Sequence, residues 1–538
     1  MGKELWQLID RFADARILVV GDAMLDCYLK GSTERLCQEA PAPIVALNAR
    51  THAPGGAANT AANVAALGAR TFFLSVVGND YEGAALRQSL EEYGVNTAHL
   101  FMESCRQTLA KNRIISSGQI LLRLDQGSAE SIGASCEAEL LARLDRLFPQ
   151  CDAVIVSDYG YGVLTPRVIA ALEAWQRAAP RVVVVDAKNL LAYARVATAV
   201  KPNYVETVNL LVSSGAPPPG GGSRAEWIAA HGARILELTG ARLAAVTLDT
   251  EGVLLLEHDC PAYHLPAQPA PQTHSAGAGD TFVSALALAL AAGAEAQTAG
   301  RIAAMAAAVV VAKEGTACCS PDELRYRILD EGKCVSDAAS LALLVEARRR
   351  LRQLIVFTNG CFDLLHRGHV EYLNRAREHG DALIVGVNSD AGVRRLKGPG
   401  RPVNRLEDRL QVLSALNCVD HLIAFEEDTP SEIIRALKPD VFVKGGDYRR
   451  ETIAEAPLVE ALGGSVEILP CFADLSTTRL IERIQGGGSN GYHNGDSRER
   501  AGLARGGSRA SLARSEEEID YEHNGGVASR HENTLHQA

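Results

Sequence analysis

The sequence lacks several features that would assign it to a simple class of protein. No stretch reaches the roughly 18 uninterrupted apolar residues of a membrane-spanning helix, and the N-terminal residues lack the apolar segment of a signal peptide. The twelve cysteines form no CxxC pair and no Cys/His spacing typical of a metal site. Positive charge is not in excess, because the net charge is −11, which argues against a nucleic-acid partner. We therefore expect a cytoplasmic protein with reduced thiols, no membrane insertion and no bound nucleic acid.

What the sequence does contain is an α/β pattern on a chain long enough for two or three domains. In the first half, apolar runs alternate with stretches of helical character, which predicts a doubly wound parallel sheet. The predicted strands lie at residues 16–26, 71–78, 152–160, 181–188 and 243–256. The segment GAPPPGGG at 215–222 fits neither a helix nor a strand, so it predicts a surface loop.

A second, smaller series of apolar runs predicts one Rossmann-like unit, with strands at 353–360, 382–390, 421–425, 441–446 and 465–470. The expected organisation is a first domain over 1–320, a helical linker over 321–350, a second domain over 351–485 and a tail over 486–538. The tail is rich in Gly, Ser, Arg and Glu and poor in Leu, Ile and Val. It cannot bury enough surface to offset its ordering entropy, so we expect it to be disordered.

Small residues precede a predicted helix at SAGAGDTF, residues 275–282. The backbone N–H groups of Gly277, Ala278 and Gly279 can converge on an anion at the start of this helix. Asp280 lies in its first turn, where it can take a proton from a hydroxyl that attacks a phosphoryl group. A glycine-rich turn is also compatible with a purely structural role.

Further polar residues stand at turns that follow predicted strands. Gly55, Gly56 and Asn59 belong to a second glycine turn that opens a helix, PGGAANTAANVAALGA at 54–69. Asp22 and Asp26 come at the carboxyl end of the first strand, where ligands bind in open α/β sheets. The segment KPNYVE, residues 201–206, offers an amide and a carboxylate near the expected phosphate region.

These motifs, in this order, resemble the ribokinase-like sugar kinase family over roughly residues 14–320. The resemblance implies that Asp280 is the catalytic base and that the amides of 277–279 form the anion hole. It implies that the sugar contacts four residues: Asp22, Gly55, Gly56 and Asn59. It also implies that Asn203 and Glu206 serve the phosphates of Mg–ATP, with Glu206 as the Mg²⁺ ligand, and that Thr247 and Gly252 lie near the nucleotide.

The resemblance also carries a departure and an expectation about assembly. Three residues before Gly277 the family usually has Asp, whereas this chain has His274. Kinase domains of the family often pair through a small β lid, to which residues 42–48 could belong. We therefore expect a homodimer or a higher homo-oligomer formed through the kinase domain.

Basic residues around a predicted hairpin bear on the substrate. Lys111, Arg113 and Arg123 flank AKNRIISSGQILLRLD, and Lys188 follows a predicted strand. On a solvated face such charges need no further explanation. If Lys111, Arg123 and Lys188 point into the cleft, they suit a sugar that already carries a phosphate.

The second unit opens with TNGCFDLLHRGH, residues 358–369, where Gly360 allows a tight turn after a strand. A spacing of three puts His366 and His369 on one face of the following helix, near its positive end. Two imidazoles there can bind the phosphates of a nucleoside triphosphate and stabilise a departing pyrophosphate. Carboxylates at metal-ligand spacing are missing around the pair, which disfavours zinc.

Two further segments supply groups that bind phosphate. LKGPGRPVNRLEDR, residues 396–409, contains Lys397, Arg401 and Arg409 on a Gly-Pro stretch that could close over phosphates. LSTTRLIERI, residues 475–484, places Ser476, Thr477 and Thr478 at a predicted helix start. Helix capping alone would also explain these three hydroxyls.

Residues 353–485 resemble the HxGH nucleotidyltransferase family, through TNGCFDLLHxGH, NSD, KGxxRPVN, FEEDTP, VKGGDY and STT. The resemblance implies that the histidines are catalytic and that further residues contact the nucleotide or its phosphates: Thr358, Asn359, Gly360, Phe362, Lys444, Gly445 and Asp447. A kinase followed by such a domain resembles the bifunctional enzymes of ADP-heptose biosynthesis, over about 470 residues.

That resemblance implies two reactions and their cofactors. The first is phosphorylation of heptose 7-phosphate at the anomeric hydroxyl. The second is adenylyl transfer from ATP to heptose 1-phosphate, which gives ADP-heptose, a nucleotide sugar for lipopolysaccharide or another glycoconjugate. Both reactions use Mg²⁺ and ATP, and a separate phosphatase must remove the 7-phosphate between them. Two alternatives stay open: a CTP-using polyol-phosphate enzyme fused to another sugar kinase, and a kinase half that only binds or regulates.

Overall fold

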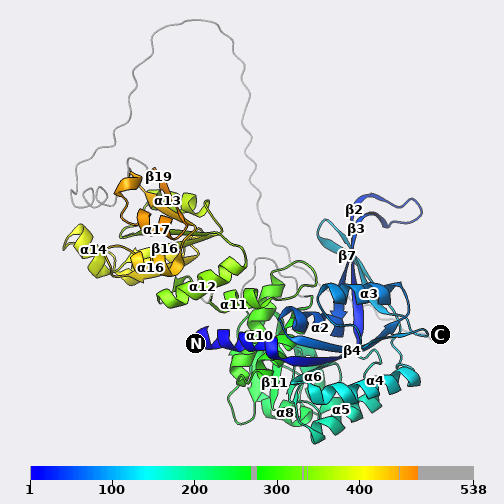
Figure 1. Cartoon of the computed structure of the whole chain (residues 1–538). Coiled ribbons are helices and arrows are strands. Elements are labelled where there is room, and N and C mark those ends of the chain that lie inside the picture. The colour runs from blue at the N-terminus through cyan, green and yellow to red at the C-terminus, as the bar shows by residue number, and fades with distance from the viewer. Residues whose placement is uncertain (1, 268–275, 330–331, 336, 447–448, 471–538) are drawn as a thin grey trace, which may run out of the picture. The chain divides into compact units, whose positions relative to one another are not determined.

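The structure is a computed structural model of the 538-residue chain, and it describes residues 2–267, 276–329, 332–335, 337–446 and 449–470. Two separate sheets, each with its own helices, account for most of these residues (Figure 1). Each sheet is described by itself. Within the described residues, no helix is both long enough and apolar enough to cross a membrane.

The first sheet consists of nine strands in the described part of the chain, which confirms the predicted doubly wound architecture. The strands are parallel except at one edge, where a β-meander reverses the direction. Their order is β13 (Tyr263–Leu265), β12 (Val253–Glu257), β11 (Leu243–Thr247), β10 (Ala199–Val200), β9 (Val182–Ala187), β8 (Ala153–Asp158), β1 (Arg16–Gly21), β4 (Arg70–Gly78) and β5 (Leu100–Glu103).

Both faces of this sheet are covered by helices, because side chains alternate along each strand. On β1, Ile17 and Val19 enter one core, while Leu18 and Val20 enter the other. The first core is closed by α1 (Gly2–Asp10), α2 (Ala57–Ala66), α3 (Tyr81–Glu92), α9 (Ala278–Ala291), α10 (Ala296–Val311) and α11 (Pro321–Leu329). The second is closed by α4 (Ala134–Leu147), α5 (Pro166–Ala178), α6 (Tyr204–Ser213), α7 (Arg224–Ala230) and α8 (Gly232–Thr239).

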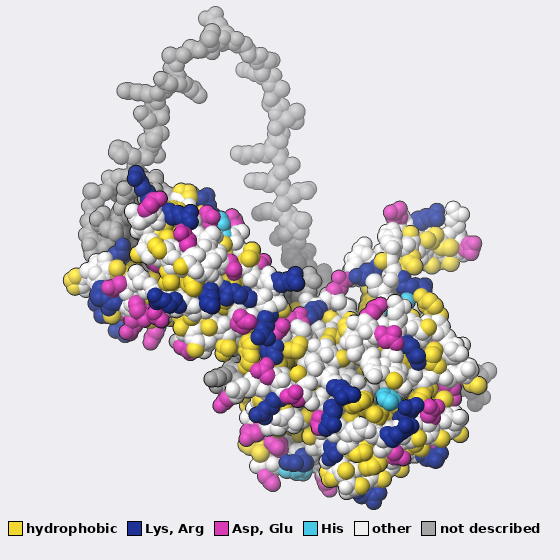
Figure 2. Space-filling view, viewed as in Figure 1, with side chains coloured by type: hydrophobic (Ala, Val, Ile, Leu, Met, Phe, Trp, Pro, Cys, Tyr) yellow, Lys and Arg dark blue, Asp and Glu magenta, His cyan; other side chains and the backbone are white. Residues whose placement is uncertain are grey.

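A four-stranded lid sheet stands away from this body (Figure 1). Its order is β3 (Pro43–Gly56), β2 (Ala23–Leu36), β6 (Leu109–Ser116) and β7 (Gln119–Gln126). The hairpin expected at 110–125 is therefore present as β6 and β7, and residues 42–48 lie at the start of β3. Figure 2 shows apolar side chains on the lid surface among charged ones.

The second sheet is parallel throughout the described strands, as a Rossmann-like unit requires. Its order is β14 (Cys334–Val335), β17 (His421–Phe425), β16 (Ala382–Asn388), β15 (Ile355–Gly360), β18 (Val441–Gly445) and β19 (Ser465–Leu469). Its two faces are covered by α12 (Ala338–Arg350), α16 (Ser431–Leu437) and α17 (Ala456–Ala461), and by α13 (Arg367–Arg377) and α15 (Leu406–Ser414); α14 (Asp390–Lys397) follows β16.

Short elements complete the description. Five single-turn 3₁₀ helices lie within the described residues: η1 (Arg11–Asp14), η2 (Phe148–Gln150), η3 (Leu190–Tyr193), η4 (Asp249–Glu251) and η5 (Arg450–Thr452). The 215–222 segment connects α6 to α7 without regular structure, as predicted. The tail predicted at 486–538 lies outside the described residues.

The segment 321–350 is mostly helical, as predicted, but its helices are not free connectors. Leu324 and Ile328 of α11 belong to the first core. Leu341, Leu344 and Val345 of α12 belong to a core of the second sheet. The apolar positions of this charged stretch therefore pack into two different cores, a distinction that its helical pattern does not reveal.

This assignment of the two helices is testable with two matched substitutions, Leu324→Ala and Leu341→Ala, because both side chains are completely buried. Removing a buried leucine costs about 2–5 kcal/mol of unfolding free energy, which should lower a transition midpoint by roughly 10 °C. We expect each substitution to lower a different one of two calorimetric transitions of the full chain. A single transition that both substitutions shift equally would contradict two separate cores.

Candidate active sites

The start of α9 forms the centre of the first site. Gly277 precedes the helix with a left-handed φ of 84°, which turns the chain into the helix. Asp280 lies in the first turn and is only 7% exposed. Its Oδ2 accepts a hydrogen bond of 2.7 Å from Asn59 Nδ2, and its Oδ1 accepts one of 2.9 Å from the Tyr159 hydroxyl. Both oxygens of the predicted base are therefore held by neighbouring donors.

The environment of Asp280 suits a group that exchanges a proton near neutral pH. Burial raises its pKa to about 6, and the nearby charge of Asp186 acts in the same direction. The hydrogen bonds from Asn59 and Tyr159 and the charge of Lys201 oppose that increase. Because a general base works best when its pKa lies near the operating pH, this position fits the predicted role.

Lys201 is a component of this site to which the sequence analysis assigned no role. Its Nζ lies 3.1 Å from Asp186 Oδ2, and the side chain is buried. A Cβ atom on Gly279 would lie 3.2 Å from the same Nζ, so this ammonium stands beside the amides that start α9. Together the charge and the N–H groups form a cradle for an anion. The signal was the first letter of KPNYVE, where a lysine directly follows a strand.

The predicted glycine turn lies beside the base. Gly56 has a φ of 56°, and a Cβ there would lie 2.6 Å from Met24 Cε. Asn59 and Asn63 are buried on the helix α2 that the turn opens, and Asn63 Nδ2 donates to Asn59 Oδ1 at 3.1 Å. Asn59 therefore orients Asp280 through a chain of amides, in addition to any contact with a sugar.

The surroundings of Asp22 do not favour the predicted contact with a sugar. Asp22 has no exposed surface, and its carboxylate accepts three backbone N–H groups, from Tyr159, Tyr161 and Val163 at 2.9–3.1 Å. Three of the roughly four acceptor positions of this carboxylate are occupied by the loop that follows β8, so Asp22 holds that loop. The sequence placed it correctly at the end of β1, but the direction of the side chain depends on tertiary contacts.

Asp26 takes the position that we had expected for Asp22. Asp26 lies further along the chain, in β2. A Cβ on Gly55 would lie 3.1 Å from its carboxyl carbon. Arg113 Nη1 contacts Asp26 Oδ1 at 2.8 Å, and Thr316 donates to the other oxygen at 3.1 Å. This carboxylate therefore faces the glycine turn at the base of the lid.

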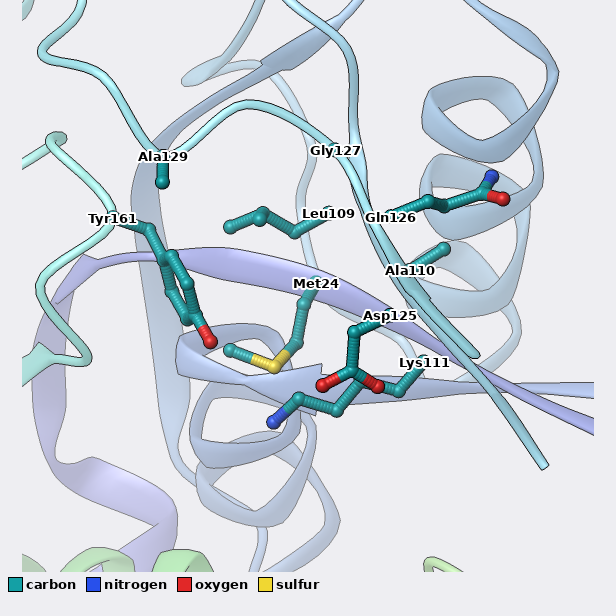
Figure 3. Close-up of a pocket in the computed structure, with 9 residues that line it drawn as sticks. All are labelled: Met24, Leu109, Ala110, Lys111, Asp125, Gln126, Gly127, Ala129 and Tyr161. Atoms are coloured by element: carbon teal, nitrogen blue, oxygen red, sulfur yellow. The ribbon is translucent and has the colours of Figure 1, made fainter. Parts of the chain in front are cut away.

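Lys111 of the hairpin lies in a pocket at the base of the lid. Lys111 lines a pocket of about 120 Å³ between the lid and the loop after β8, where its side chain and those of Met24 and Tyr161 extend toward one another (Figure 3). Lys111 Nζ lies 5.6 Å from the centre of the Tyr159 ring, and burial lowers the pKa of this lysine. An incoming anion would stabilise its charged form.

Lys188 and Arg123 complete the predicted substrate cations. Lys188 is exposed, with Nζ 5.2 Å from the centre of the Tyr161 ring, so it lies beside the same loop as Lys111. Arg123 does not line the pocket with Lys111. Its side chain is 55% exposed and pairs with Asp125 on its own strand at 2.9 Å. The structure therefore gives Arg123 a local surface ion pair, and we remove it from the expected substrate contacts.

The predicted nucleotide residues of the first unit gather at the carboxyl ends of β10 and β11. Asn203 and Glu206 form a reciprocal capping box at the start of α6, with bonds of 2.8 and 2.9 Å. Thr247, the last residue of β11, pairs with Asn203 through a β-bridge. Gly252 closes the next turn with a φ of 98°, and a Cβ there would lie 2.0 Å from Leu265 O. Capping and turn geometry account for the residue types at these positions. The same contacts bring the predicted nucleotide residues close to one another.

The donor set is compatible with a hydrated Mg²⁺ ion. Among the described residues, no group of three or more His, Cys, Asp or Glu side chains could hold a metal ion. Mg²⁺ typically takes one or two carboxylates and completes its shell with phosphates and water. Glu206 offers such a carboxylate, because its Oε2 serves the capping box and Oε1 remains for another ligand. Burial raises the pKa of Glu206, an effect that a nearby cation would reverse.

The second site is built around the histidine pair. His366 caps the start of α13, and the rings of His366 and His369 stack with centroids 3.9 Å apart. Burial lowers the pKa of both rings, that of His369 to about 4, and the neighbouring His366 adds to the effect. Both Nδ1 atoms are buried without a hydrogen-bond partner among the described residues. Phe362 packs edge-on against His369 with centroids 5.4 Å apart.

Residues that precede the pair shape the floor of this site. Phe362 has a φ of 45°, and a Cβ on Gly360 would lie 3.0 Å from its ring. Thr358 shares a hydrogen bond of 2.7 Å with the Tyr372 hydroxyl, which donates to Val443 O. These contacts tie β15, α13 and β18 together around the end of β15.

The lysine of the VKGG motif is also close. Lys444 Nζ donates to Asn359 Oδ1 at 2.7 Å and to Glu455 Oε1 at 2.8 Å. A Cβ on Gly445 would lie 2.7 Å from the Tyr372 ring. The structure thus brings Asn359, Lys444 and Gly445 to the same edge of the second sheet as the histidines.

The basic residues of the 396–409 segment differ sharply in their surroundings. Arg409 is completely buried and donates to Asn404 O, Cys361 O and Asp390 Oδ1 at 2.6–3.2 Å. Each nitrogen of its guanidinium donates to a protein group, so its surroundings favour a structural role over the predicted phosphate contact. Its role is to hold the loop.

Arg401 and Lys397 complete that segment. Arg401 pairs with Asp363, whose carboxylate also accepts the backbone N–H groups of Val403 and Asn404. Lys397, at the end of α14, is exposed and available to a phosphate. His274 lies outside the described residues. So do four predicted phosphate-binding residues: Asp447, Ser476, Thr477 and Thr478.

Comparison with known proteins relates these two sites to families. Residues 14–323 match the pfkB family of carbohydrate kinases, and residues 357–483 match the cytidylyltransferase-like family. Among solved structures, phosphofructokinase-2 from Escherichia coli, in complex with substrates and products, is similar with a TM-score of 0.49 and 19% identity, over 58% of this chain and 98% of that chain.

Curated relatives match nearly the whole length. The bifunctional protein HldE of Alcanivorax borkumensis is 40% identical over 481 residues, which cover 89% of this chain and 98% of that protein. The protein of the same name from Paramagnetospirillum magneticum is 40% identical over 496 residues, which cover 90% and 99%. That from Pseudomonas paraeruginosa is 41% identical over 479 residues, which cover 88% and 98%.

These matches confirm the predictions of a sugar kinase fused to a nucleotidyltransferase and of a ribokinase-like fold followed by a Rossmann-like domain. The identities and coverages are high enough to show the family and not only the fold. The chain therefore belongs to the family of the bifunctional HldE proteins, in which a heptose 7-phosphate kinase is joined to a heptose 1-phosphate adenylyltransferase.

Proposed function

We propose that the site at the start of α9 transfers the γ-phosphoryl group of ATP to the anomeric hydroxyl of D-glycero-D-manno-heptose 7-phosphate. The observation that carries this proposal is the buried carboxylate of Asp280, whose pKa is raised to about 6 beside the amides of Gly277–Gly279. Asp280 takes the hydroxyl proton as the oxygen attacks the γ-phosphorus, and ADP leaves. The products are a sugar 1,7-bisphosphate and ADP.

The sugar is held between the glycine turn and the lid. Gly55 and Gly56 let its hydroxyls approach the backbone, and the Asp26 carboxylate replaces Asp22 as their acceptor. Lys111 and Lys188, which flank Tyr159 and Tyr161, are suited to the 7-phosphate. A sugar that already carries a phosphate explains why a lysine is partly buried in the lid pocket.

The nucleotide side uses the carboxyl ends of β10 and β11. Asn203, Thr247 and Gly252 border the nucleotide, and Lys201 stands beside the amides that receive the transferred group. Glu206 holds the ion when Mg²⁺ is bound, and that ion neutralises part of the charge on the phosphates. The chain's own contribution is to position the two substrates in line and to supply the base.

The second site joins ATP to the sugar 1-phosphate. An oxygen of the sugar 1-phosphate attacks the α-phosphorus of ATP. The bond between that phosphorus and the oxygen bridging to the β-phosphate breaks, which releases pyrophosphate. His366 and His369 donate to the phosphates; Lys397, Lys444 and Asn359 add positive charge or hydrogen bonds at the same edge. Burial lowers the pKa of both imidazoles and favours their neutral form, and the approaching phosphate charge favours their protonated form.

The two reactions require a further enzyme between them. The first product carries two phosphates, whereas the second reaction starts from a sugar with a single phosphate at the anomeric carbon. A separate cytoplasmic phosphatase that removes the 7-phosphate supplies that substrate.

The lid also supports pairing of two copies of this chain. Leu122 and Leu124 of the edge strand β7 are 51% and 49% exposed and lie on one face of it, because side chains alternate along a strand. Ile120 and Leu47 add exposed apolar surface to the same sheet. An edge strand with apolar side chains favours association with another strand edge. A second copy of this lid is the occupant that we propose.

Asp280→Asn tests the kinase. With heptose 7-phosphate, ATP and Mg²⁺, mass spectrometry should detect the bisphosphate from the wild-type chain, and the variant should be slower by about 10²- to 10⁴-fold because it cannot accept the proton. Adenylyl transfer to heptose 1-phosphate should be unchanged, which controls for folding. Equal background rates for both proteins would favour a kinase half that only binds or regulates.

His369→Ala tests the second site. Loss of one preorganised donor to the departing charge should reduce adenylyl transfer by about 10²-fold or more. The matched control is His379→Ala, because His379 follows the same helix α13 at its other end. Bisphosphate formation should be normal in both variants. A parallel loss of both activities in His369→Ala, or adenylyl transfer at the wild-type rate, would contradict the assignment.

The double substitution Leu122→Arg with Leu124→Arg tests the lid interface. It should convert the dimer into a monomer in light scattering after gel filtration, because two charges would be buried against the partner strand. Leu191→Arg is the control, since Leu191 is 48% exposed but lies in η3, away from the lid sheet. A wild-type chain that is monomeric, or a variant of unchanged mass, would show that the lid does not pair two copies.

A further inference from the structure

The loop that follows β8 connects two buried carboxylates of the first site, Asp22 and Asp280. Its residues Tyr159, Tyr161 and Val163 donate their backbone N–H groups to the buried Asp22 carboxylate. The residue before the loop, Asp158, accepts a hydrogen bond of 2.6 Å from the buried Tyr193 hydroxyl. The Asp22 carboxylate therefore holds the loop itself and with it the backbone of Tyr159, whereas the Tyr193 hydroxyl holds only the end of β8.

Tyr159 occupies a place between the substrate lysine and the base. Its hydroxyl donates to Asp280 Oδ1 at 2.9 Å, while its ring lies under Lys111 Nζ at 5.6 Å. Burial, followed by the charge of Asp280, raises the pKa of this phenol well above its ordinary value. The phenol therefore stays protonated and acts as a donor throughout the working pH range.

We propose that Tyr159 is a positioning residue for phosphoryl transfer, whose phenol holds the Asp280 carboxylate in its reactive orientation and stabilises its charged form. This inference rests on the proposed kinase function. Asn59 holds the other oxygen, so the two donors prevent rotation of the carboxylate. Asp22 affects Asp280 only indirectly, because it holds the backbone of the loop that carries Tyr159.

Other groups face Asp280 from each element around it. Asp186 at the end of β9 raises its pKa, and Lys201 after β10 lowers it. The Cys318 thiol also senses the Asp280 charge, but burial raises the pKa of that thiol to about 12, so it stays neutral. Removing the phenol changes neither Asp186 nor Lys201. A shift in the titration of Asp280 would therefore report the loss of the donor itself.

Tyr159→Phe in the full chain removes the hydroxyl and keeps the ring under Lys111. A hydrogen bond to the charged form of a carboxylate lowers its pKa, so its loss should raise the pKa of Asp280. Because the base works only when it is deprotonated, the acid limb of kcat/KM for heptose 7-phosphate should move to higher pH. We expect a shift of about one pH unit, which corresponds to a tenfold lower rate on that limb.

Tyr193→Phe is the matched control, because it removes a buried phenol that donates to the carboxylate of Asp158 at the end of β8 and is not bonded to Asp280. Its acid limb should coincide with that of the wild type. The pH profile of adenylyl transfer should be identical in all three proteins. A merely structural role of Tyr159 would lower the amount of active protein at every pH without moving the limb.

A measurement without substrate keeps the outcome independent of the proposed reaction. Infrared difference spectra against the corresponding Asp280→Asn proteins give the protonation midpoint of Asp280 directly. A higher midpoint in Tyr159→Phe than in the wild type and in Tyr193→Phe supports the inference, even if heptose 7-phosphate is not phosphorylated and the proposed function fails. Coincident midpoints overturn the role of Tyr159, whether or not the kinase reaction is observed.

Discussion

The arrangement of the first unit depends on keeping one carboxylate, Asp280, buried and still able to ionise. Burial opposes its charge, and Asn59, Tyr159 and Lys201 restore enough stabilisation to leave its pKa at about 6. These residues come from segments far apart in the sequence. The parallel sheet brings them together, because the carboxyl ends of its strands meet at one edge and α9 starts there.

The second unit solves a related problem with the opposite charge. Its two imidazoles are stacked and partly buried, and burial lowers the pKa of both, which favours their neutral form. The floor under them is rigid, since Thr358, Tyr372 and Val443 are linked by hydrogen bonds across three elements. In both units the proposed site lies at the start of a helix, where N–H groups and side chains could act on the same negative charge.

Three predicted site residues show why a motif does not determine a side chain's surroundings. Asp22 and Arg409 are buried and bound by protein groups, and Arg123 pairs with its neighbour Asp125. Each has the residue type that phosphate or sugar chemistry requires, but the motif does not predict the protein groups that bind it. Conversely, the sequence analysis assigned no role to Tyr159 or Lys201, and they matter because they reach Asp280 and the start of α9.

Sequence by itself determined the two α/β units, the lid hairpin, the turns that lead to Asp280 and to His366–His369, and the family, because periodicity and short motifs are local properties of the chain. Only the tertiary structure decided which carboxylate faces the cleft, which cations are free and which core each helix of 321–350 joins. Those outcomes depend on hydrogen-bond partners and buried neighbours that a local sequence pattern does not identify, whether they are two residues away, as for Arg123, or 137, as for Asp22. A saturated buried charge and an available one look the same in the sequence, and they differ only in what surrounds them.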